Sequence, residues 1–267
     1  TDEWGAVMFD ACPLREKIDS GRPVLGTWNT LAAPLATEAM AVAGLDFQVV
    51  DLEHGPFLLD RVHEHVSACE GAGMCAPLVR IPTNADWMAL QALDQGAHGV
   101  VVPHVADAAS ATKLVSALRY QPSGGRGFTP FSKAGGFDNR DVNSHIERSN
   151  RGVVGVVIVE SVEALEVAAD IALVDGIDVV YFGAYDLSQA LGYPGQPRHP
   201  AVVEAITEGV ERVRAVDCCA GGFVPQDRSG IAELLEMGMG FITYDVDASI
   251  LFRHLADLAE WFGGEVG

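Results

Sequence analysis

Short apolar runs rich in β-branched residues alternate with longer segments of helical periodicity from about residue 23 to the end of the chain. This alternation is typical of βα units, in which helices cover a parallel sheet. Several runs are almost continuously apolar, as expected for strands that are buried on both faces. The eight predicted strands are Pro23–Asn29, Phe47–His54, Ala76–Pro82, Gly99–Val105, Val153–Ser161, Asp178–Asp186, Cys219–Val224 and Phe241–Val246.

The predicted helices lie between these strands, and glycine follows many of them, where helix C-caps are expected. They cover Leu35–Ala43, Leu59–Gly71, Asp86–Gly96, Asp107–Tyr120, Val162–Val174, Ala201–Val216, Ile231–Met237 and Ile250–Phe262. Eight units predict one α/β domain over residues 1–267, a closed (β/α)8 TIM barrel with a short N-terminal extension over about residues 1–20. An open, doubly wound sheet is the alternative, although no G-x-G-x-x-G motif follows the first strand.

The connection over residues 120–150 interrupts this regular spacing. It is rich in Gly, Ser, Arg and Asn. Connections of this length without secondary structure are usually functional or disordered. We therefore predict a long loop here.

Composition and charge narrow the class of protein. The formal net charge of −20 opposes binding to nucleic acid or to an anionic membrane, because both require a basic surface. No apolar run reaches the ~18 residues that span a bilayer, and the first 20 residues do not resemble a signal peptide, so a cytoplasmic protein is expected. The five scattered cysteines predict neither a disulfide framework nor a zinc site.

Two acidic residues follow neighbouring predicted strands. Glu160 comes directly after the apolar residues 155–159, which cannot compensate its charge. Asp186 ends the next predicted strand, and adjacent strands lie about 4.8 Å apart, so both carboxylates can reach one ion. Their oxygens suit Mg²⁺, Mn²⁺ or Co²⁺ better than a sulfur-rich zinc site does. In the alternative, each carboxylate caps the following helix or pairs with an arginine.

Arginine, aspartate and histidine lie at the ends of two earlier strands. The Arg80 guanidinium can bind a carboxylate or a developing enolate oxygen in a planar fork, or can form a structural ion pair. Asp51 and His54 suggest an imidazole that a carboxylate orients, as in many general bases, although a lone histidine is more often structural. Glu53 is predicted to point to the other face, because side chains alternate along a strand.

In this order, these residues belong to motifs that resemble the HpcH/HpaI family of metal-dependent class II pyruvate aldolases. The resemblance covers nearly the whole chain, and the ordered set is specific although each motif alone is not. The motifs are Gly26-Thr27-Trp28, Ala43-Gly44-Leu45-Asp46, Asp51-Leu52-Glu53-His54-Gly55-Pro56, Val79-Arg80-Ile81-Pro82, Val101-Val102-Pro103, Arg119-Tyr120-Gln121-Pro122, Gly125-Arg126-Gly127, Glu160-Ser161, Gly183-Ala184-Tyr185-Asp186-Leu187-Ser188 and His199-Pro200.

The resemblance implies a role for each candidate site residue. Glu160 and Asp186 are expected to bind the divalent cation, together with water and the carboxylate and keto oxygens of a 2-oxo acid. Arg80 is expected to stabilise the enolate oxygen. His54, supported by Asp51, is expected to deprotonate the hydroxyl of the aldol. The remaining implied residues are Asp94, which approaches this pair from a neighbouring subunit, and Trp28, Gly183, Ala184 and Tyr185, which contact the substrate.

The resemblance also implies a homo-oligomer, commonly a hexamer built as a trimer of dimers whose subunits exchange their last helix. The segment Ile250–Phe262 carries apolar residues at helical spacing that suit such an exchange. Docking of this helix onto its own barrel is equally consistent with the periodicity.

Three departures from the family pattern lie around one predicted pocket. Ala184 and Tyr185 replace Pro and Ala, residues 128–137 replace a segment usually rich in Ala, Arg and Ser, and residues 243–245 replace small residues. These changes put the identity of the acceptor aldehyde in doubt. The residues for the metal and the enolate are all present.

The leading functional hypothesis is a lyase that reversibly cleaves a 4-hydroxy-2-oxo acid into pyruvate, or a related 2-oxo acid, and an aldehyde. A biosynthetic carbon–carbon bond-forming enzyme or an oxaloacetate decarboxylase on the same fold is the alternative, since each requires the same enolate. A non-catalytic binding or regulatory barrel is a further alternative. A Schiff-base aldolase is disfavoured, because Lys17, Lys113 and Lys133 all lie away from the predicted strand ends.

Overall fold

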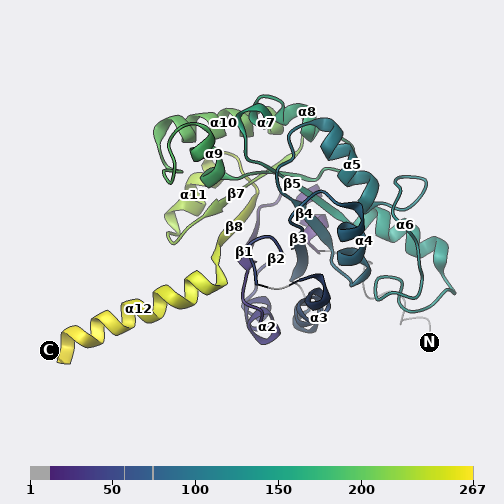
Figure 1. The fold of residues 1–267 in the computed structure, drawn as a ribbon, viewed down its shortest axis with the longest axis horizontal. Helices are drawn as coiled ribbons and strands as arrows, with labels where there is room; N and C mark the ends of the chain where they lie inside the picture. The colour runs from purple at the N-terminus through teal and green to yellow at the C-terminus, as the bar shows by residue number, and fades with distance from the viewer. Residues whose placement is uncertain (1–12, 57, 74, 267) are drawn as a thin grey trace.

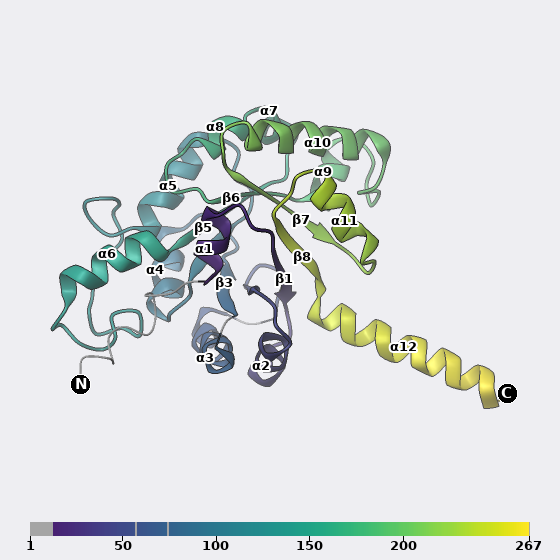
Figure 2. The same cartoon turned by 180° about the vertical axis from the view of Figure 1, so that it is seen from behind.

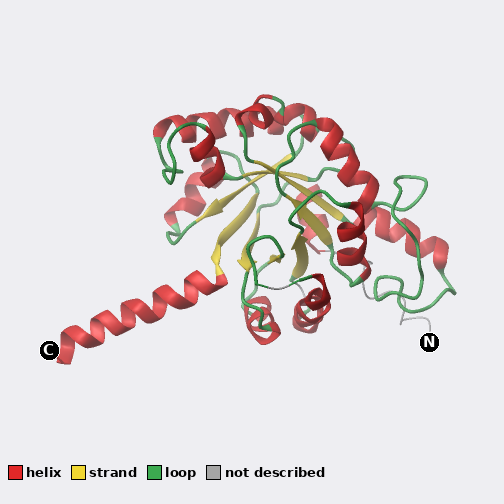
Figure 3. Cartoon of the chain, viewed as in Figure 1, coloured by secondary structure: helices red, strands yellow, loops and turns green. Residues whose placement is uncertain are grey.

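The strands form a closed parallel barrel. The computed structural model describes residues 13–56, 58–73 and 75–266, and Figure 3 shows the strands at the centre with helices around them. Each strand pairs in parallel with the next in the sequence, and β8 pairs with β1. The strands are β1 Val24–Asn29, β2 Phe47–Asp51, β3 Ala76–Arg80, β4 Gly99–Val102, β5 Val154–Val159, β6 Val179–Phe182, β7 Cys219–Val224 and β8 Phe241–Val246. The predicted (β/α)8 barrel is therefore confirmed, and the open sheet is excluded.

Helices connect the strands and cover the outside of the barrel, except for the first helix, which precedes β1, and the last, which follows β8 and extends away (Figure 1). They are α1 Pro13–Asp19, α2 Pro34–Val42, α3 Val62–Ala72, α4 Asp86–Asp94, α5 Ala108–Leu118, α6 Val142–Gly152, α7 Val162–Glu166, α8 Ala168–Ala172, α9 Ala184–Ala190, α10 Pro200–Arg214, α11 Ser229–Glu236 and α12 Asp247–Val266, with a 3-10 turn at Leu59–Arg61. Among the described residues, none of these helices is long and apolar enough to cross a membrane.

Large side chains fill the interior of the barrel. The rings of Phe47 and Phe241 stack with their centroids 4.1 Å apart. This packing requires glycine at position 26, because a Cβ there would lie 2.5 Å from the Phe47 ring. The outer faces of the strands bury mainly valine against the helices. The barrel is therefore a packed core rather than a pore, and ligands must bind at its rim.

Besides strands that end a few residues earlier than predicted, three predicted elements differ from the observed ones. The sixth strand ends at Phe182, and α9 begins two residues later, so Tyr185 and Asp186 lie in the first turn of a helix. The predicted long loop contains α6, whose buried residues are His145, Ser149 and Gly152 and whose only large apolar side chains are Val142 and Ile146. The predicted helix over residues 162–174 is two helices, since Val167 between them has non-helical dihedral angles.

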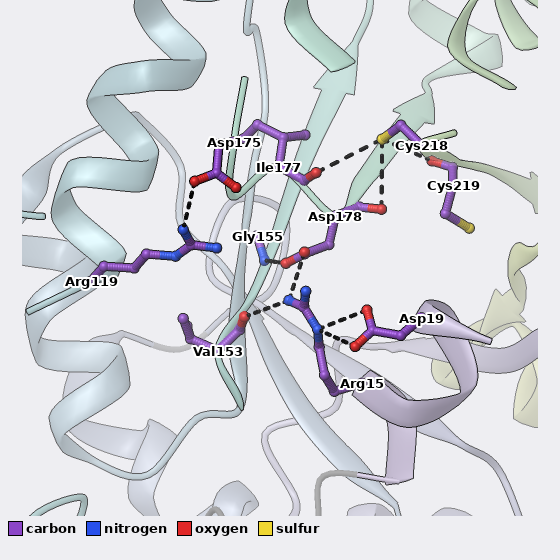
Figure 4. Close-up of polar contacts among 10 residues, drawn as sticks. All are labelled: Arg15, Asp19, Arg119, Val153, Gly155, Asp175, Ile177, Asp178, Cys218 and Cys219. Carbon is purple, nitrogen blue, oxygen red and sulfur yellow. Dashed lines mark hydrogen bonds and ion pairs between the residues drawn. The ribbon is translucent and has the colours of Figure 1, made fainter. Parts of the chain in front are cut away.

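Helix α1 packs at the amino ends of the strands (Figure 2). Arg15 donates to a side-chain oxygen of Asp178 at 2.6 Å and to the backbone oxygen of Val153 at 3.2 Å (Figure 4). The second Asp178 oxygen accepts from the Gly155 backbone N–H at 2.8 Å. These bonds tie α1 to β5 and β6. The other part of the predicted N-terminal extension, residues 1–12, lies outside the described residues.

Replacing Arg15 by alanine is expected to destabilise the protein by about 3 kcal/mol at neutral pH, because the Asp178 carboxylate then stays buried without its cation. Burial already raises the pKa of Asp178 above its ordinary value. A folded state with a raised carboxyl pKa binds more protons than the unfolded chain, so its stability falls as pH rises through that range. The loss of stability in Arg15→Ala should therefore be smaller at acidic than at neutral pH. Urea unfolding at each of these two pH values measures this difference.

The matched background for this test is Asp178→Asn. In that background the Arg15→Ala change should cost less than about 1 kcal/mol, because no buried charge is left unpaired. An equal cost in both backgrounds would mean that Arg15 acts through packing and not through the ion pair.

Four of the five cysteines lie within the described residues, and all four are free thiols. Cys69 and Cys75 are buried, whereas Cys218 and Cys219 are half-buried near the amino ends of the strands. Burial raises the pKa of Cys218 to about 12 and that of Cys219 to about 11. These two thiols therefore stay protonated at neutral pH and are poor nucleophiles.

Helix α12 extends away from the barrel (Figure 1). Only its first residue, Asp247, is buried, and the remaining side chains include large exposed apolar residues. These residues are Ile250, Leu251, Phe252, Leu255, Leu258, Trp261, Phe262 and Val266. The predicted alternative in which this helix docks onto its own barrel is therefore wrong, whereas exchange between subunits stays a prediction.

Candidate active site at the carboxyl ends of the strands

An ion pair joins the ends of β2 and β3. Asp51 and Arg80 are register partners on these strands. The Arg80 Nε and Nη2 atoms donate to the two Asp51 oxygens at 2.8 and 2.5 Å. Both side chains are buried, so this bidentate pair holds the guanidinium in one orientation.

Glu53 also faces the guanidinium, contrary to the prediction that it points to the other face. Its Oε2 lies 3.0 Å from Arg80 Nη1. Strand β2 ends at Asp51, and residues 52–54 form a turn, so the alternation of side chains along a strand does not apply to them. The turn brings Glu53 back over the barrel end.

His54 lies at the rim of the same turn, where its side chain is 72% exposed. Its backbone N–H donates to Asp51 Oδ1 at 3.2 Å, as does that of Glu53 at 3.0 Å. The imidazole Nε2 lies 4.0 Å from Glu53 Oε2. Asp51 therefore positions the backbone of His54. The imidazole was expected to face Asp51, but it faces Glu53 instead.

Glu160 directly follows β5 and is buried at the barrel end. Its Oε2 accepts from the His104 backbone N–H at 2.9 Å and lies 2.9 Å from His104 Nδ1. Ser161 caps α7 by accepting from the Ala164 N–H, so Glu160 is not the helix cap that the alternative required. The carboxylate thus projects over the rim.

The electrostatic surroundings of Glu160 disfavour its charge. Burial raises the pKa of this carboxyl above its ordinary value, and the neighbouring carboxylates of Asp186 and Glu53 add to the rise. The backbone N–H and the imidazole of His104 oppose it. A bound cation would offset the same repulsion.

Asp186 lies in the first turn of α9 and is exposed. Gly183 separates it from Glu160, and a Cβ at this position would lie 2.7 Å from Glu160 Cγ. Ala184 packs against the core. Tyr185 is 49% exposed and its ring lies 6.2 Å from that of Phe223, so it stands at the rim next to Asp186.

Trp28 lies beneath the guanidinium of Arg80, whose Cζ is 4.2 Å from the centre of the indole. The indole Nε1 donates to Thr243 Oγ1 at 3.0 Å, and this hydroxyl lies 2.5 Å from Tyr181 Oη. Burial raises the pKa of Tyr181 to about 12, so its phenol stays neutral. Thr243, one of the departures from the family pattern, thus fixes the indole under the site.

Asp94 is the last residue of α4, which leads away from the carboxyl end of β3. Its carboxylate accepts from Arg126 Nη2 at 2.7 Å. The Arg126 guanidinium is buried and stacks over the ring of Tyr120 at 4.4 Å. Asp94 is therefore held at the surface, away from Asp51, Arg80 and Glu160 at the strand ends of its own barrel.

The charges of the strand-end cluster suit a cation. Four carboxylates (Asp51, Glu53, Glu160 and Asp186) lie near one guanidinium. Glu160 and Asp186 have no arginine partner among the ion pairs of the described residues. Within the same described residues, no group of three or more His, Cys, Asp or Glu side chains could hold a metal. The two carboxylates fit a hard divalent ion whose other ligands are water or substrate oxygens.

The three lysines lie elsewhere. Lys17 on α1 pairs with Asp46, Lys113 on α5 donates to the Asn84 carbonyl, and Lys133 pairs with Glu70. None of them ends a barrel strand, so the structure offers no lysine for Schiff-base chemistry at this rim.

A polar cavity of about 590 Å³ lies at the opposite, amino end of the barrel. Its charged lining includes Arg15, Arg119, Asp175 and Asp178, which pair with one another. Active sites of this fold lie at the carboxyl end. We therefore place the chemistry at the strand-end cluster and not in this cavity.

His104 and Glu53 are not among the site residues predicted from the sequence. His104 follows β4 and Pro103, so the rule that polar residues at strand ends form the site would have found it. It was missed because the predicted strand ran on to Val105.

The family of this chain follows from its sequence. The profile of the HpcH/HpaI aldolase/citrate lyase family matches residues 25–253. The chain therefore belongs to this family of carbon–carbon lyases.

Individual relatives resemble the chain over almost its full length. A hydroxypyruvate/pyruvate aldolase of Pseudomonas aeruginosa is 34% identical, covering 94% of this chain and 92% of its own. A 4-hydroxy-2-oxo-heptane-1,7-dioate aldolase of Salmonella arizonae is 34% identical, covering 94% of both chains. The crystal structure of citrate synthase SbnG is 30% identical with a TM-score of 0.84, covering 95% of this chain and 99% of its own.

Proposed function

We propose that this protein is a metal-dependent aldolase that reversibly cleaves a 4-hydroxy-2-oxo acid into pyruvate, or a close 2-oxo acid, and an aldehyde. The observation that carries the proposal is the pair of carboxylates, Glu160 and Asp186, at the same barrel rim as the fixed guanidinium of Arg80. The pyruvate and 4-hydroxy-2-oxo-heptane-1,7-dioate aldolases among the relatives support the same reaction.

Glu160 and Asp186 would hold the cation, which we propose to be Mg²⁺, Mn²⁺ or Co²⁺. When bound, this ion supplies Lewis-acid chemistry that polarises the keto oxygen of the 2-oxo acid. Trp28 and the segment from Gly183 to Tyr185 border the position and would contact the substrate.

Arg80 has donors left for the reacting oxygen. Three of its five N–H groups face Asp51 and Glu53, which leaves one on Nη1 and one on Nη2. When the bond between C3 and C4 breaks, its electron pair passes into the enolate of the 2-oxo acid. The remaining N–H groups would stabilise the negative charge on this enolate.

His54 would take the proton. Its exposed imidazole can accept the proton of the C4 hydroxyl as the aldehyde carbonyl forms. The protonated imidazole can then protonate C3 of the enolate, which completes the 2-oxo acid, and the same transfers run in reverse in the synthetic direction. Asp51 supports this role through the backbone of the turn, since it accepts the N–H of residue 54.

A second candidate is a carbon–carbon bond-forming enzyme or a decarboxylase that takes its enolate from oxaloacetate. The similarity to citrate synthase SbnG supports it. So does Tyr185, which stands beside Asp186 where the family pattern has alanine and which changes the rim that meets the second substrate.

We further propose that the protein is a homo-oligomer in which copies associate through α12, as a hexamer built from dimers. The uncovered apolar side chains of this helix support association. The Arg126-anchored Asp94 is the residue that would reach the His54–Asp51 pair of a neighbouring subunit.

Removal and return of metal tests the proposed function. EDTA-stripped protein should release no pyruvate from a racemic 4-hydroxy-2-oxo acid, and addition of Mg²⁺, Mn²⁺ or Co²⁺ should restore the release, because the enolate charge is otherwise uncompensated. Pyruvate release only from oxaloacetate, above the rate with metal alone, would favour the second candidate. Equal activity with and without EDTA would contradict both.

A further inference from the structure

His104 contacts the buried carboxylate of Glu160 from the end of the neighbouring strand. We propose that His104 is a positioning residue that fixes one oxygen of Glu160 and so leaves the other directed at the cation. This inference rests on the proposed function of Glu160 as a metal ligand.

Two nitrogen atoms of His104 lie next to the same carboxylate oxygen. The backbone N–H donates to Glu160 Oε2 at 2.9 Å, and the imidazole Nδ1 lies 2.9 Å from that same oxygen. The other oxygen, Oε1, faces the start of α9, since a Cβ at Gly183 would lie 3.2 Å from it. The carboxylate is thus held by Oε2, and Oε1 points toward the segment that carries Asp186.

The backbone of His104 has an unusual conformation. Its φ is 55°, in the left-handed region that residues with a side chain seldom adopt. Such conformations persist where the surroundings hold them, and they cluster at functional sites. Here the residue in this conformation places its backbone N–H and its imidazole Nδ1 against one carboxylate oxygen.

The imidazole of His104 lies closer to Glu160 than to Glu53. Its Nδ1 is 2.9 Å from Glu160 Oε2, whereas Nε2 is 3.6 Å from Glu53 Oε1, which is beyond hydrogen-bond range. Neighbours that orient metal-binding groups in this way typically contribute 10- to 100-fold in metal affinity.

Manganese titration of the metal-free protein, followed by the electron paramagnetic resonance signal of free Mn²⁺, tests this inference without reference to activity. His104→Gly and His104→Asn both accept the left-handed backbone, but only asparagine keeps a side-chain N–H near the position of Nδ1. We expect His104→Gly to bind Mn²⁺ about tenfold or more weakly and His104→Asn to stay within about threefold of the native protein.

His54→Asn is the matched control, because this histidine lies on the same rim but faces Glu53 and not Glu160. It should leave the affinity for Mn²⁺ unchanged. Thermal unfolding of each variant tests whether the barrel still folds.

The outcomes separate this inference from the proposed function. Native affinity in His104→Gly, or equally weak binding by the glycine and asparagine variants, overturns the role of His104 while the proposed function stands. Failure of the native protein to bind Mn²⁺, or undiminished binding by Glu160→Gln, overturns the proposed function and this inference with it.

Discussion

Replacing Glu160 by glutamine is expected to abolish Mn²⁺ binding and to lower kcat by about 10³-fold or more. The amide keeps the hydrogen bond from the His104 backbone but loses the charge that holds the cation. Without the cation, the enolate loses several kcal/mol of stabilisation, and each 1.36 kcal/mol is about a factor of ten in rate. Asp186→Asn should give the same loss of binding. Manganese titration and pyruvate release measure the two effects.

Glu163→Gln is the control for this change. It makes the same substitution three residues further on, at an exposed position in the first turn of α7. Its affinity and kcat should equal those of the native protein. Full activity in Glu160→Gln would contradict the assignment of the metal site, whereas equal loss in both variants would point to instability of the segment.

Arg80→Lys is expected to lower kcat by about 10²- to 10³-fold and to leave the affinity for Mn²⁺ unchanged. Lysine keeps the positive charge near Asp51, but it cannot form the bidentate pair and still donate to the reacting oxygen. The loss of one oriented donor to a developing oxyanion is of this size. Steady-state kinetics and metal titration separate the two effects.

The matched control for Arg80→Lys is Arg15→Lys, at a second arginine that pairs with a buried carboxylate, Asp178, at the opposite end of the barrel. It should cost stability, measured by urea unfolding, and leave kcat unchanged. If Arg80→Lys also loses Mn²⁺, Arg80 acts on the metal site and not on the enolate.

The barrel was predictable because its strands are buried on both faces. Residues 99–102 and 154–159 are continuously apolar, as expected for strands that are buried on both faces, and substitutions among Val, Ile and Leu would not change this pattern. Helix α6 was not predicted, because its buried residues are His145, Ser149 and Gly152 and its only large apolar side chains are Val142 and Ile146. These two residues lie four positions apart, which is helical spacing, but two apolar positions are too few to define a helix.

Residues of the candidate site were predictable where a side chain ends a strand, and their partners were not. The register of β2 and β3 sets Arg80 opposite Asp51, a fact that periodicity does not contain. The contacts of Glu53 and His104 depend on a turn and on a left-handed residue, both of which follow the last strand residue. The alternation pattern of a strand predicts nothing about residues that follow the end of the strand.

The extension of α12 beyond the closed ring has a consequence for the behaviour of the protein in solution. Strand β8 completes the barrel before α12 begins, so the apolar side chains of this helix add to the surface and not to the core. Their attraction for a second surface is opposed at long range by the net charge of −20, which salt screens. Ionic strength should therefore tune self-association while leaving the fold of the single barrel largely unaffected.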